Sequence, residues 1–354
     1  MNKKFKFNFN DNLKKLSKSN FILKFKIYNL KISKLKKLYI EMLKIRMVEL
    51  KLADLAKKKI INTPIHLSVG QESIAVAISE NLSKNDQIFG NHRSHSHILA
   101  RGTNLKNFFA ECFGKISGLS KGLGGSMHLI DKSVGFQGSV PIVGATIPIA
   151  CGYSLATKLQ KKKDITVVFF GDGACEEGVF HETLNFASVY NTPTLFVVEN
   201  NLFSSHLDIN LRQTSNKMAR FAEANNISHI TVDGNNILEM YRQSKKIIDN
   251  MKSNQKPFLI EAITYRHLGH VGPNQDIDVG VKRNKKELFA WIKNRDPLIK
   301  FQDFLLKKSF INSKFIKNQT KLIEHNINKA VKFSLKSKYP DSQLLTNLVY
   351  NEKN

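Results

Sequence analysis

Two short runs of apolar, β-forming residues, separated by a helical stretch, limit this chain to a narrow range of folds. The runs ITVVFF (165–170) and TLFVVEN (194–200) show no polar alternation, which is typical of strands buried on both faces of a parallel sheet. The helical pattern EEGVFHETLNFASVY separates them, and strand and helix patterns alternate again in HITVDGN, NILEMYRQSKKIIDNM and PFLIEAITY. Strands that alternate with helices form βαβ units. The sequence therefore predicts an α/β fold, a parallel sheet with helices on both faces.

Further helical patterns lie on both sides of these strands. The stretch LKKLYIEMLKIRMVELKLADLAKK repeats apolar residues at intervals of three and four, which predicts an amphipathic helix over about residues 35–58. A second helix is expected to begin at Gly70-Gln71-Glu72, and IACGYSLATKLQKKKD predicts a helix with a Lys-rich end. Residues 285–338 have a mainly helical pattern, and the last dozen or so residues are expected to be irregular.

Residues 89–144 differ in composition from the segments around them. GNHRSHSHILARG, GKISGLSKGLGGSMHLID and GFQGSVPIVGATIP are rich in Gly and His. Loops of this kind expose backbone and polar side chains, so we expect a binding surface made of loops. The patterns together predict three parts: a basic N-terminal extension (1–37), a central domain (38–300) and a basic helical C-terminal region (301–354).

The net charge of +26 is carried by the ends of the chain. It is +14 over residues 1–63, +1 over 64–281 and +11 over 282–354. Basic ends can bind nucleic acid or an acidic membrane. Here, however, lysines are mixed with Asn, Ile and Phe, with few arginines and no nucleic-acid-binding motif. A basic protein that holds nucleic acid and has a dead cofactor site therefore stays open as the non-enzymatic alternative, and it is the less favoured one.

Cysteine spacing and hydropathy point to an ordinary intracellular protein. The three cysteines, Cys112, Cys151 and Cys175, show no CxxC or Cys/His spacing, which disfavours a disulfide framework and a structural zinc site. Apolar stretches are short or interrupted by Gly and Pro, so no membrane span is predicted. Residues 1–38 have neither a secretory cleavage pattern nor the Arg and Ser content of an organellar presequence. A cytoplasmic location is the simplest expectation.

Two small polar clusters follow the first two predicted strands. Gly171-Asp172-Gly173 comes after ITVVFF, and Asn200-Asn201 closes TLFVVEN. The carboxyl ends of adjacent parallel strands lie side by side, and ligands bind at that edge of the sheet, so we expect Asp172 and Asn201 to be close. The flanking glycines permit a tight turn and close approach of the main chain to a ligand. One carboxylate and one amide suit Mg²⁺, which draws its other oxygens from phosphate, water and carbonyl groups.

Nearby residues indicate that the ligand carries phosphate. Arg93, within NHRSHSH, offers a forked donor for a phosphoryl oxygen. The helix expected to open near Glu176 would point backbone N–H groups at the same edge. A GDG sequence alone is often a simple turn, but its pairing with Asn200-Asn201 on a second strand end is far more specific. Glu176 and Glu177 could instead complement the dipole of the helix.

The pair GDG…NN is similar to the thiamine-diphosphate signature, and its surroundings resemble the alpha subunits of 2-oxo acid dehydrogenases of the pyruvate dehydrogenase type. The similarity runs from about residue 38 to residue 298, through HLSVGQES, HRSHSHILARG, GGSMHL, PIVGATIP, VDGN, YRHLGH and RDPL. This resemblance implies a thiamine-diphosphate-binding fold with helical N- and C-terminal extensions. It also implies that thiamine diphosphate and Mg²⁺ are the cofactors.

The resemblance also assigns roles to residues at the matching positions. Asp172, the Asn201 side chain and the Phe203 carbonyl would coordinate Mg²⁺. The positions at or near the diphosphate would be His92, Arg93, Gly173, Ala174 and Arg266. Pro141, Ile142 and Val143 would face the aminopyrimidine, although glycine is more usual at the position of Pro141. His66, His95 and His270 would surround the reacting carbon, where imidazoles can bind a carboxylate and move protons.

Glu177 departs from the family pattern close to the substrate end of the expected site. The family more often has an amide at this position. An ionised carboxylate there would repel a 2-oxo acid carboxylate by about 4 kcal/mol at 4 Å with an effective dielectric near 20. Glu177 therefore indicates a neutral substrate, a protonated Glu177 or a side chain that is turned away.

The resemblance implies oxidative decarboxylation of pyruvate, or a related 2-oxo acid, through the enamine of thiamine diphosphate. The acyl group would pass to a lipoyl group of an acyltransferase partner, whose disulfide is the acceptor. Cleavage of acetoin or another hydroxyketone is the enzymatic alternative, which Glu177 supports. The chain has no second, pyrimidine-binding half, so a beta subunit is expected to supply the activating glutamate in an α2β2 tetramer. The isolated chain would then be inactive.

Overall fold

The computed structural model describes residues 13–276 and 283–347. Its centre is a six-stranded sheet with the order β2-β1-β3-β4-β8-β7, in which all paired neighbours run parallel within the described residues. The strands are β1 (Gln87–Gly90), β2 (Phe136–Ser139), β3 (Thr166–Gly171), β4 (Thr194–Asn200), β7 (Ser228–Asp233) and β8 (Phe258–Ile263). A separate antiparallel hairpin is formed by β5 (Phe203–Ser204) and β6 (Leu207–Asp208). The parallel sheet predicted from the buried apolar runs is confirmed.

Helices cover both faces of this sheet. They are α1 (Leu13–Leu16), α2 (Ile32–Lys57), α3 (Glu72–Ser79), α4 (His95–Ala100), α5 (Leu105–Cys112), α6 (Thr146–Leu159), α7 (Gly178–Tyr190), α8 (Arg220–Ala224), α9 (Ile237–Asn254), α10 (Lys285–Arg295), α11 (Pro297–Lys307), α12 (Ser313–Lys336) and α13 (Leu344–Asn347). Successive residues of a strand point to opposite faces. Thus Val167 and Phe169 of β3 join the core with α2, α3 and α9, whereas Val168 and Phe170 join the core with α6, α7 and α10.

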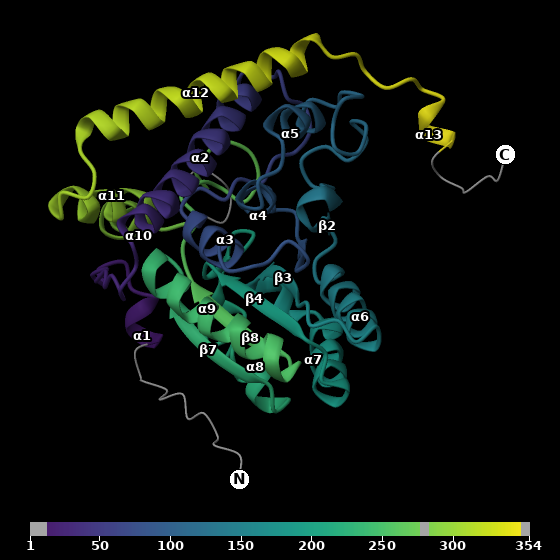
Figure 1. Cartoon of the computed structure of the whole chain (residues 1–354), viewed down its shortest axis with the longest axis vertical. Coiled ribbons are helices and arrows are strands. Elements are labelled where there is room, and N and C mark those ends of the chain that lie inside the picture. Colours follow the sequence, from purple (N-terminus) through teal and green to yellow (C-terminus); the bar gives the residue numbers. More distant parts are fainter. Residues whose placement is uncertain (1–12, 277–282, 348–354) are drawn as a thin grey trace.

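The long helices form a further layer on one side of the sheet. Figure 1 shows α12 lying across α2, with α3 between α2 and the strands. The predicted helices over 35–58, at Glu72 and within 285–338 are all confirmed. At the C-terminal end, α13 lies in the segment expected to be irregular, and residues 348–354 fall outside the described residues. No described helix is long and apolar enough to cross a bilayer.

The expectation that residues 89–144 form loops is wrong in part. The segment contains α4, α5, β2 and the end of β1 as well as loops. The helix α5 has apolar residues at Leu105, Phe108, Phe109 and Cys112, and Asn104 caps it by accepting a hydrogen bond from the Lys106 N–H. This spacing and cap are a helix signal that the many glycines around it obscured. The strands β1 and β2 have only four residues each, too few for a periodic pattern.

The start of α7 also differs from the sequence prediction. Residues Asp172–Glu176 form a 3-10 turn, Glu177 is the N-terminal cap residue, and α7 begins at Gly178. The helix therefore starts later than expected, and the tight turn permitted by Gly171 and Gly173 occupies the space directly beyond β3.

The N-terminal extension packs on the domain within its described part. The Arg295 guanidinium donates to the Lys18 carbonyl oxygen at 3.1 Å, and the Asn236 amide donates to the Lys24 carbonyl at 3.1 Å. The Tyr28 hydroxyl donates to Glu239 at 2.8 Å. Helix α11 spans the proposed boundary between residues 300 and 301, so no break in secondary structure marks that boundary. The three-part division of the chain stays a prediction.

Candidate functional site

A cavity of about 180 Å³ lies at the carboxyl edge of the sheet. Segments that follow β1, β2, β3, β4 and β8 all contribute to its wall. The sequence-predicted residues that line it are His66, His92, Arg93, Pro141, Ile142, Val143, Gly173, Ala174, Asn201, Phe203, Arg266 and His270. His95, Asp172 and Glu177 are not among the lining residues. The fold thus gathers most of the predicted site from positions spread over two hundred residues of sequence.

Asp172 and Asn201 stand at the ends of neighbouring strands, as their sequence positions predicted. In the parallel pair β3 and β4, Gly171 is opposite Glu199, which brings both strand ends to the same edge. The Asp172 side chain is fully buried, and its Oδ1 has no hydrogen-bond partner among the described residues. Burial raises the pKa of Asp172, although the guanidinium of Arg212 opposes that rise. A buried, partnerless carboxylate oxygen is the kind of donor that a hard cation needs, so the position fits Mg²⁺.

The amide of Asn201 is held by its neighbours. Its Nδ2 donates to Gln71 Oε1 at 3.4 Å, and its Oδ1 accepts a hydrogen bond from the Phe203 N–H at 3.2 Å. The Oδ1 atom retains a second lone pair, which leaves it able to coordinate a cation. Gln71 therefore orients the amide of Asn201.

Two guanidinium groups are buried beside this edge. Arg93 donates to the Leu67 carbonyl at 2.7 Å and to the His270 carbonyl at 2.9 Å. Burial lowers the pKa of Arg93 to about 10, and burial together with Arg93 lowers the pKa of Arg266. Two cations that disfavour each other in a dry site are stabilised by a multivalent anion. The pair therefore fits a diphosphate.

Three imidazoles lie together on the cavity wall. His66, His92 and His270 have ligand nitrogens within 4.8 Å of one another, and their rings meet edge to face. Burial and the nearby arginines lower the pKa of His66 to about 3, that of His92 to about 2 and that of His270 to about 3. The three rings are therefore neutral at pH 7. A cation on this cluster would sit next to Arg93, whose Nη2 is 3.4 Å from His270 Nδ1, so an anion or a neutral group fits better.

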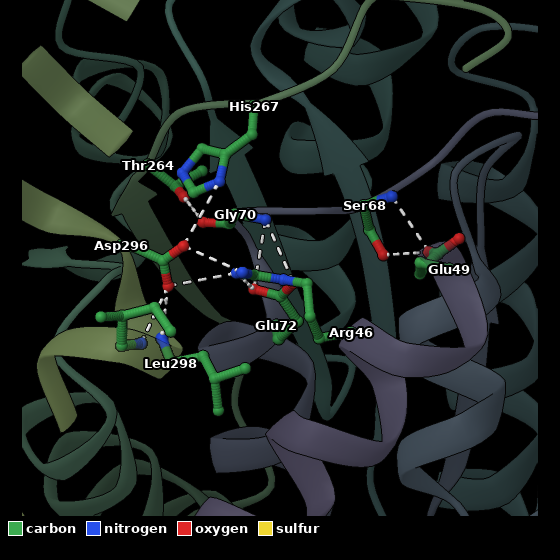
Figure 2. Close-up of polar contacts among 10 residues, drawn as sticks. Arg46, Glu49, Ser68, Gly70, Glu72, Thr264, His267, Asp296 and Leu298 are labelled. Atoms are coloured by element: carbon green, nitrogen blue, oxygen red, sulfur yellow. Dashed lines mark hydrogen bonds and ion pairs between the residues drawn. The ribbon is translucent and has the colours of Figure 1, made fainter. Parts of the chain in front are cut away.

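His95 lies deeper, in a buried polar chain below the cavity. Its Nδ1 is 2.9 Å from Glu49 Oε2, and its Nε2 is 2.7 Å from the hydroxyl of Ser126. Glu49 also accepts hydrogen bonds from the N–H and hydroxyl of Ser68, a contact drawn in Figure 2. Burial alone would raise the pKa of Glu49, but His95 and Ser68 hold it below its usual value. The predicted role of His95 near the reacting carbon stays a prediction.

Glu177 is exposed at the rim, beside Gly144. Its side chain lies against Gly144, which lines the cavity, although Glu177 itself is not a lining residue, so the three alternatives raised by its carboxylate stay predictions.

Several wall residues were missed by the sequence analysis. They are Gln71, Asn91, Met127, Gly144, Thr146, Phe170, Glu199, Ser204 and Ser205. Gln71 and Asn91 stand inside the motifs VGQES and GNHRSHSH, so those motifs could have identified them. Arg212 contacts Asp172 across 40 residues of sequence and stands in no motif that the sequence analysis used, so no local signal identified it.

Comparison with known proteins decides the family. Residues 40–343 match the dehydrogenase E1 component family. The chain belongs to the dehydrogenase E1 component family. It is 38% identical to the alpha subunit of acetoin:2,6-dichlorophenolindophenol oxidoreductase of Bacillus subtilis (strain 168), over 80% of this chain and 84% of that one.

Two further relatives carry the name pyruvate dehydrogenase E1 component subunit alpha. The chain is 32% identical to the protein of Rickettsia felis, over 80% of this chain and 86% of the relative. It is also 32% identical to the chloroplastic alpha-3 protein of Arabidopsis thaliana, over 82% and 68%. The family uses thiamine diphosphate with a divalent metal ion, so the two predicted cofactors are confirmed. The resemblance to alpha subunits of thiamine-diphosphate-dependent 2-oxo acid dehydrogenases is confirmed as well.

A network of buried charged side chains joins the segments that carry part of the cavity wall. Figure 2 shows Arg46 of α2 between Glu72 of α3 and Asp296, the N-terminal cap residue of α11. Arg46 donates to Glu72 at 2.5 and 3.0 Å and to Asp296 at 2.9 and 3.2 Å. Glu72 accepts from the Gly70 N–H, and Asp296 lies 3.6 Å from His267. The network fixes the segments that carry the cavity residues at positions 66, 71 and 266.

His267 makes the stability of the E1 chain dependent on pH. Burial and Arg46 lower the pKa of His267 to about 3, below its usual 6.5. Below pH 6.5 the unfolded chain takes up a proton here and the folded chain does not, so stability is complete above pH 6.5 and falls as the pH drops toward 3. As the pH drops below 6.5, the free energy of unfolding should therefore decrease more steeply for the unaltered chain than for His267→Gln. The two slopes should differ by about 1.4 kcal/mol per pH unit. Urea titrations between pH 6.5 and 5 measure both slopes, and equal slopes would contradict the assignment.

Proposed function

We propose that this chain is the alpha subunit of an enzyme that oxidatively decarboxylates pyruvate and passes the acyl group to a lipoyl group on an acyltransferase partner. The observation that carries the proposal is the grouping at one sheet edge of a buried carboxylate with one partnerless oxygen, two buried guanidinium groups and neutral imidazoles. The names of the Rickettsia felis and Arabidopsis thaliana relatives support the choice of pyruvate. The cytoplasmic location remains part of the proposal.

The proposed roles follow from the chemistry of each group. Asp172, the Asn201 amide oxygen and the Phe203 carbonyl would hold Mg²⁺. Bound thiamine diphosphate supplies the carbon nucleophile and electron sink that decarboxylation needs. Additional contacts to the diphosphate and the ring system would come from His92, Arg93, Pro141, Val143, Gly173, Ala174 and Arg266. The imidazoles of His66 and His270 are neutral at pH 7, so each can donate one hydrogen bond and accept another near the substrate.

Two observations support a beta subunit that completes the site. The cavity of about 180 Å³ is smaller than the pockets of about 300–1,000 Å³ that usually enclose ligands of cofactor size, so this chain by itself encloses part of such a molecule. Beside it, apolar side chains are exposed at Ile142, Val143, Ile149, Tyr153, Phe186 and Val189, along the rim and on α6 and α7. Large apolar surfaces of this kind are typical of protein interfaces. An α2β2 tetramer is proposed on these grounds.

A second candidate is an enzyme that cleaves acetoin. The Bacillus subtilis relative, named for acetoin, has the higher identity of the three described above. Glu177 at the rim supplies a further argument, since a neutral hydroxyketone would not be repelled by its carboxylate.

Substrate profiling of the reconstituted complex distinguishes the two candidates. The chain is combined with its beta subunit, thiamine diphosphate, Mg²⁺ and 2,6-dichlorophenolindophenol as electron acceptor. We expect reduction of the dye with pyruvate, little with acetoin, and none with the isolated chain. Activity with acetoin and none with pyruvate would favour the second candidate instead. Activity with neither, together with DNA retention that is lost at high salt, would favour the basic-protein alternative.

A further inference from the structure

The hairpin β5/β6 and the turn that follows it make hydrogen bonds with groups that the proposed function assigns to the cofactors. The Arg212 Nη2 donates to Asp172 Oδ2 at 2.5 Å, and its Nη1 donates to Glu176. At the other end of the hairpin, Arg266 Nη2 donates to the Ser205 carbonyl oxygen at 2.7 Å. One local segment thus puts a guanidinium group against Asp172, the carboxylate of the proposed metal site. It also puts a carbonyl oxygen against Arg266, which is proposed to contact the diphosphate.

The arrangement is well enclosed. The Arg212 side chain is 6% exposed and the Asp172 side chain is 1% exposed, so water does not screen their attraction effectively. The Arg212 Nε also donates to the Leu207 carbonyl at 3.2 Å, which ties the guanidinium to the hairpin itself. Ser204 packs on the GDG turn so closely that a Cβ atom at Gly173 would meet its hydroxyl at 2.6 Å. The hairpin is therefore docked on the turn that carries Asp172.

Two non-glycine residues, one just before the hairpin and one in its turn, have a strained backbone conformation. Leu202 has φ of 71° and Ser205 has φ of 51°, both in the left-handed region. Such strain is found where the surrounding contacts maintain it, and it often marks segments that can change conformation. At Ser205 the hydrogen bond from Arg266 to the carbonyl oxygen is such a contact. At Leu202 the N–H donates to Asn200 Oδ1 and the carbonyl oxygen accepts from the Ile209 N–H.

We propose that Arg212 is an internal competitor of Mg²⁺, a latch that closes the cofactor site until the metal displaces it. The guanidinium neutralises the buried carboxylate of Asp172 and, because like charges repel, it opposes a divalent cation on the same group. Binding of Mg²⁺ with the diphosphate releases Arg212 from Asp172 and Ser205 from Arg266 together. The affinity for the metal is then set partly by the latch, which is a coupling between segment and site. This inference rests on the proposed metal site.

The test is the dissociation constant of Mg²⁺, measured by isothermal titration calorimetry on the full chain with saturating thiamine diphosphate, alone and assembled with its beta subunit. We expect Arg212→Gln to bind Mg²⁺ about tenfold more tightly than the unaltered chain, within the usual range of such couplings. Arg212→Lys keeps a cation but loses the fork that joins Asp172 to Glu176, and it should lie between the two.

Arg220→Gln is the matched control. Arg220 donates to Gln213 and Thr214 in the same region without touching Asp172, so this variant should leave the Mg²⁺ dissociation constant unchanged. If Arg212→Gln binds Mg²⁺ equally well or more weakly, Arg212 is no competitor and the latch is overturned while the metal site stands. If the unaltered chain and the variant both fail to bind Mg²⁺, the proposed metal site fails and the latch with it.

Discussion

Replacing Asp172 with alanine is expected to abolish turnover that depends on thiamine diphosphate. Asp172 is the carboxylate at the end of β3, it is fully buried, and its Oδ1 has no partner among the described residues. Its loss removes the one negative side chain of the proposed metal triad. A bound metal contributes several kcal/mol of charge stabilisation, so we expect a fall in kcat/KM of about 10³-fold or more. Dye reduction in the reconstituted complex measures this loss, and calorimetry with Mg²⁺ should show no binding.

Two variants separate a metal defect from a folding defect. Asp172→Asn keeps an oxygen that can accept from Arg212 but lacks the charge, so its Mg²⁺ affinity should fall while circular dichroism still shows a folded chain. Asp249→Ala removes an exposed carboxylate on α9 that pairs with Lys245, and full activity is expected. Turnover of Asp172→Ala equal to that of the unaltered complex would refute the metal assignment.

Replacing Arg46 with alanine is expected to lower the free energy of unfolding by about 3–5 kcal/mol. The guanidinium is the shared partner of Glu72 and Asp296, and all three side chains are buried. Without it, two carboxylates face each other in a low-dielectric interior with no cation between them. The same change loosens the junction of α2, α3 and α11. Urea denaturation of the isolated chain, followed by circular dichroism, measures the change.

A neutral network tests whether the effect comes from unpaired charge. Combining Arg46→Met with Glu72→Gln and Asp296→Asn removes all three charges, so the triple variant should be more stable than Arg46→Ala. Lys58→Ala removes an exposed partner of Asp54, a residue of helix α2, and should leave the free energy of unfolding nearly unchanged. Equal stability of Arg46→Ala and the unaltered chain would show that the network does not stabilise the fold.

Local sequence patterns predicted the sheet and its helices well, because buried parallel strands and amphipathic helices each have a periodicity of their own. The long helix α2 and the strands β3, β4, β7 and β8 were therefore recognisable. The four-residue strands β1 and β2 were not, since their pairing depends on neighbours rather than on their own residues. The same limit applies to α4, where the buried histidines gave no apolar stripe.

For the site, the sequence by itself was enough to identify the residues that stand at strand ends. Asp172 and Asn201 could be placed together from their positions in the sequence, because parallel topology brings the ends of successive strands to one edge. The family motifs added the residues around them. The tertiary structure alone decided which neighbours those residues have. Arg212 on Asp172, the Ser205 carbonyl on Arg266 and the seclusion of His95 beside Glu49 are contacts between distant segments. Burial and charge at those contacts depend on packing in three dimensions, and no spacing along the sequence encodes them.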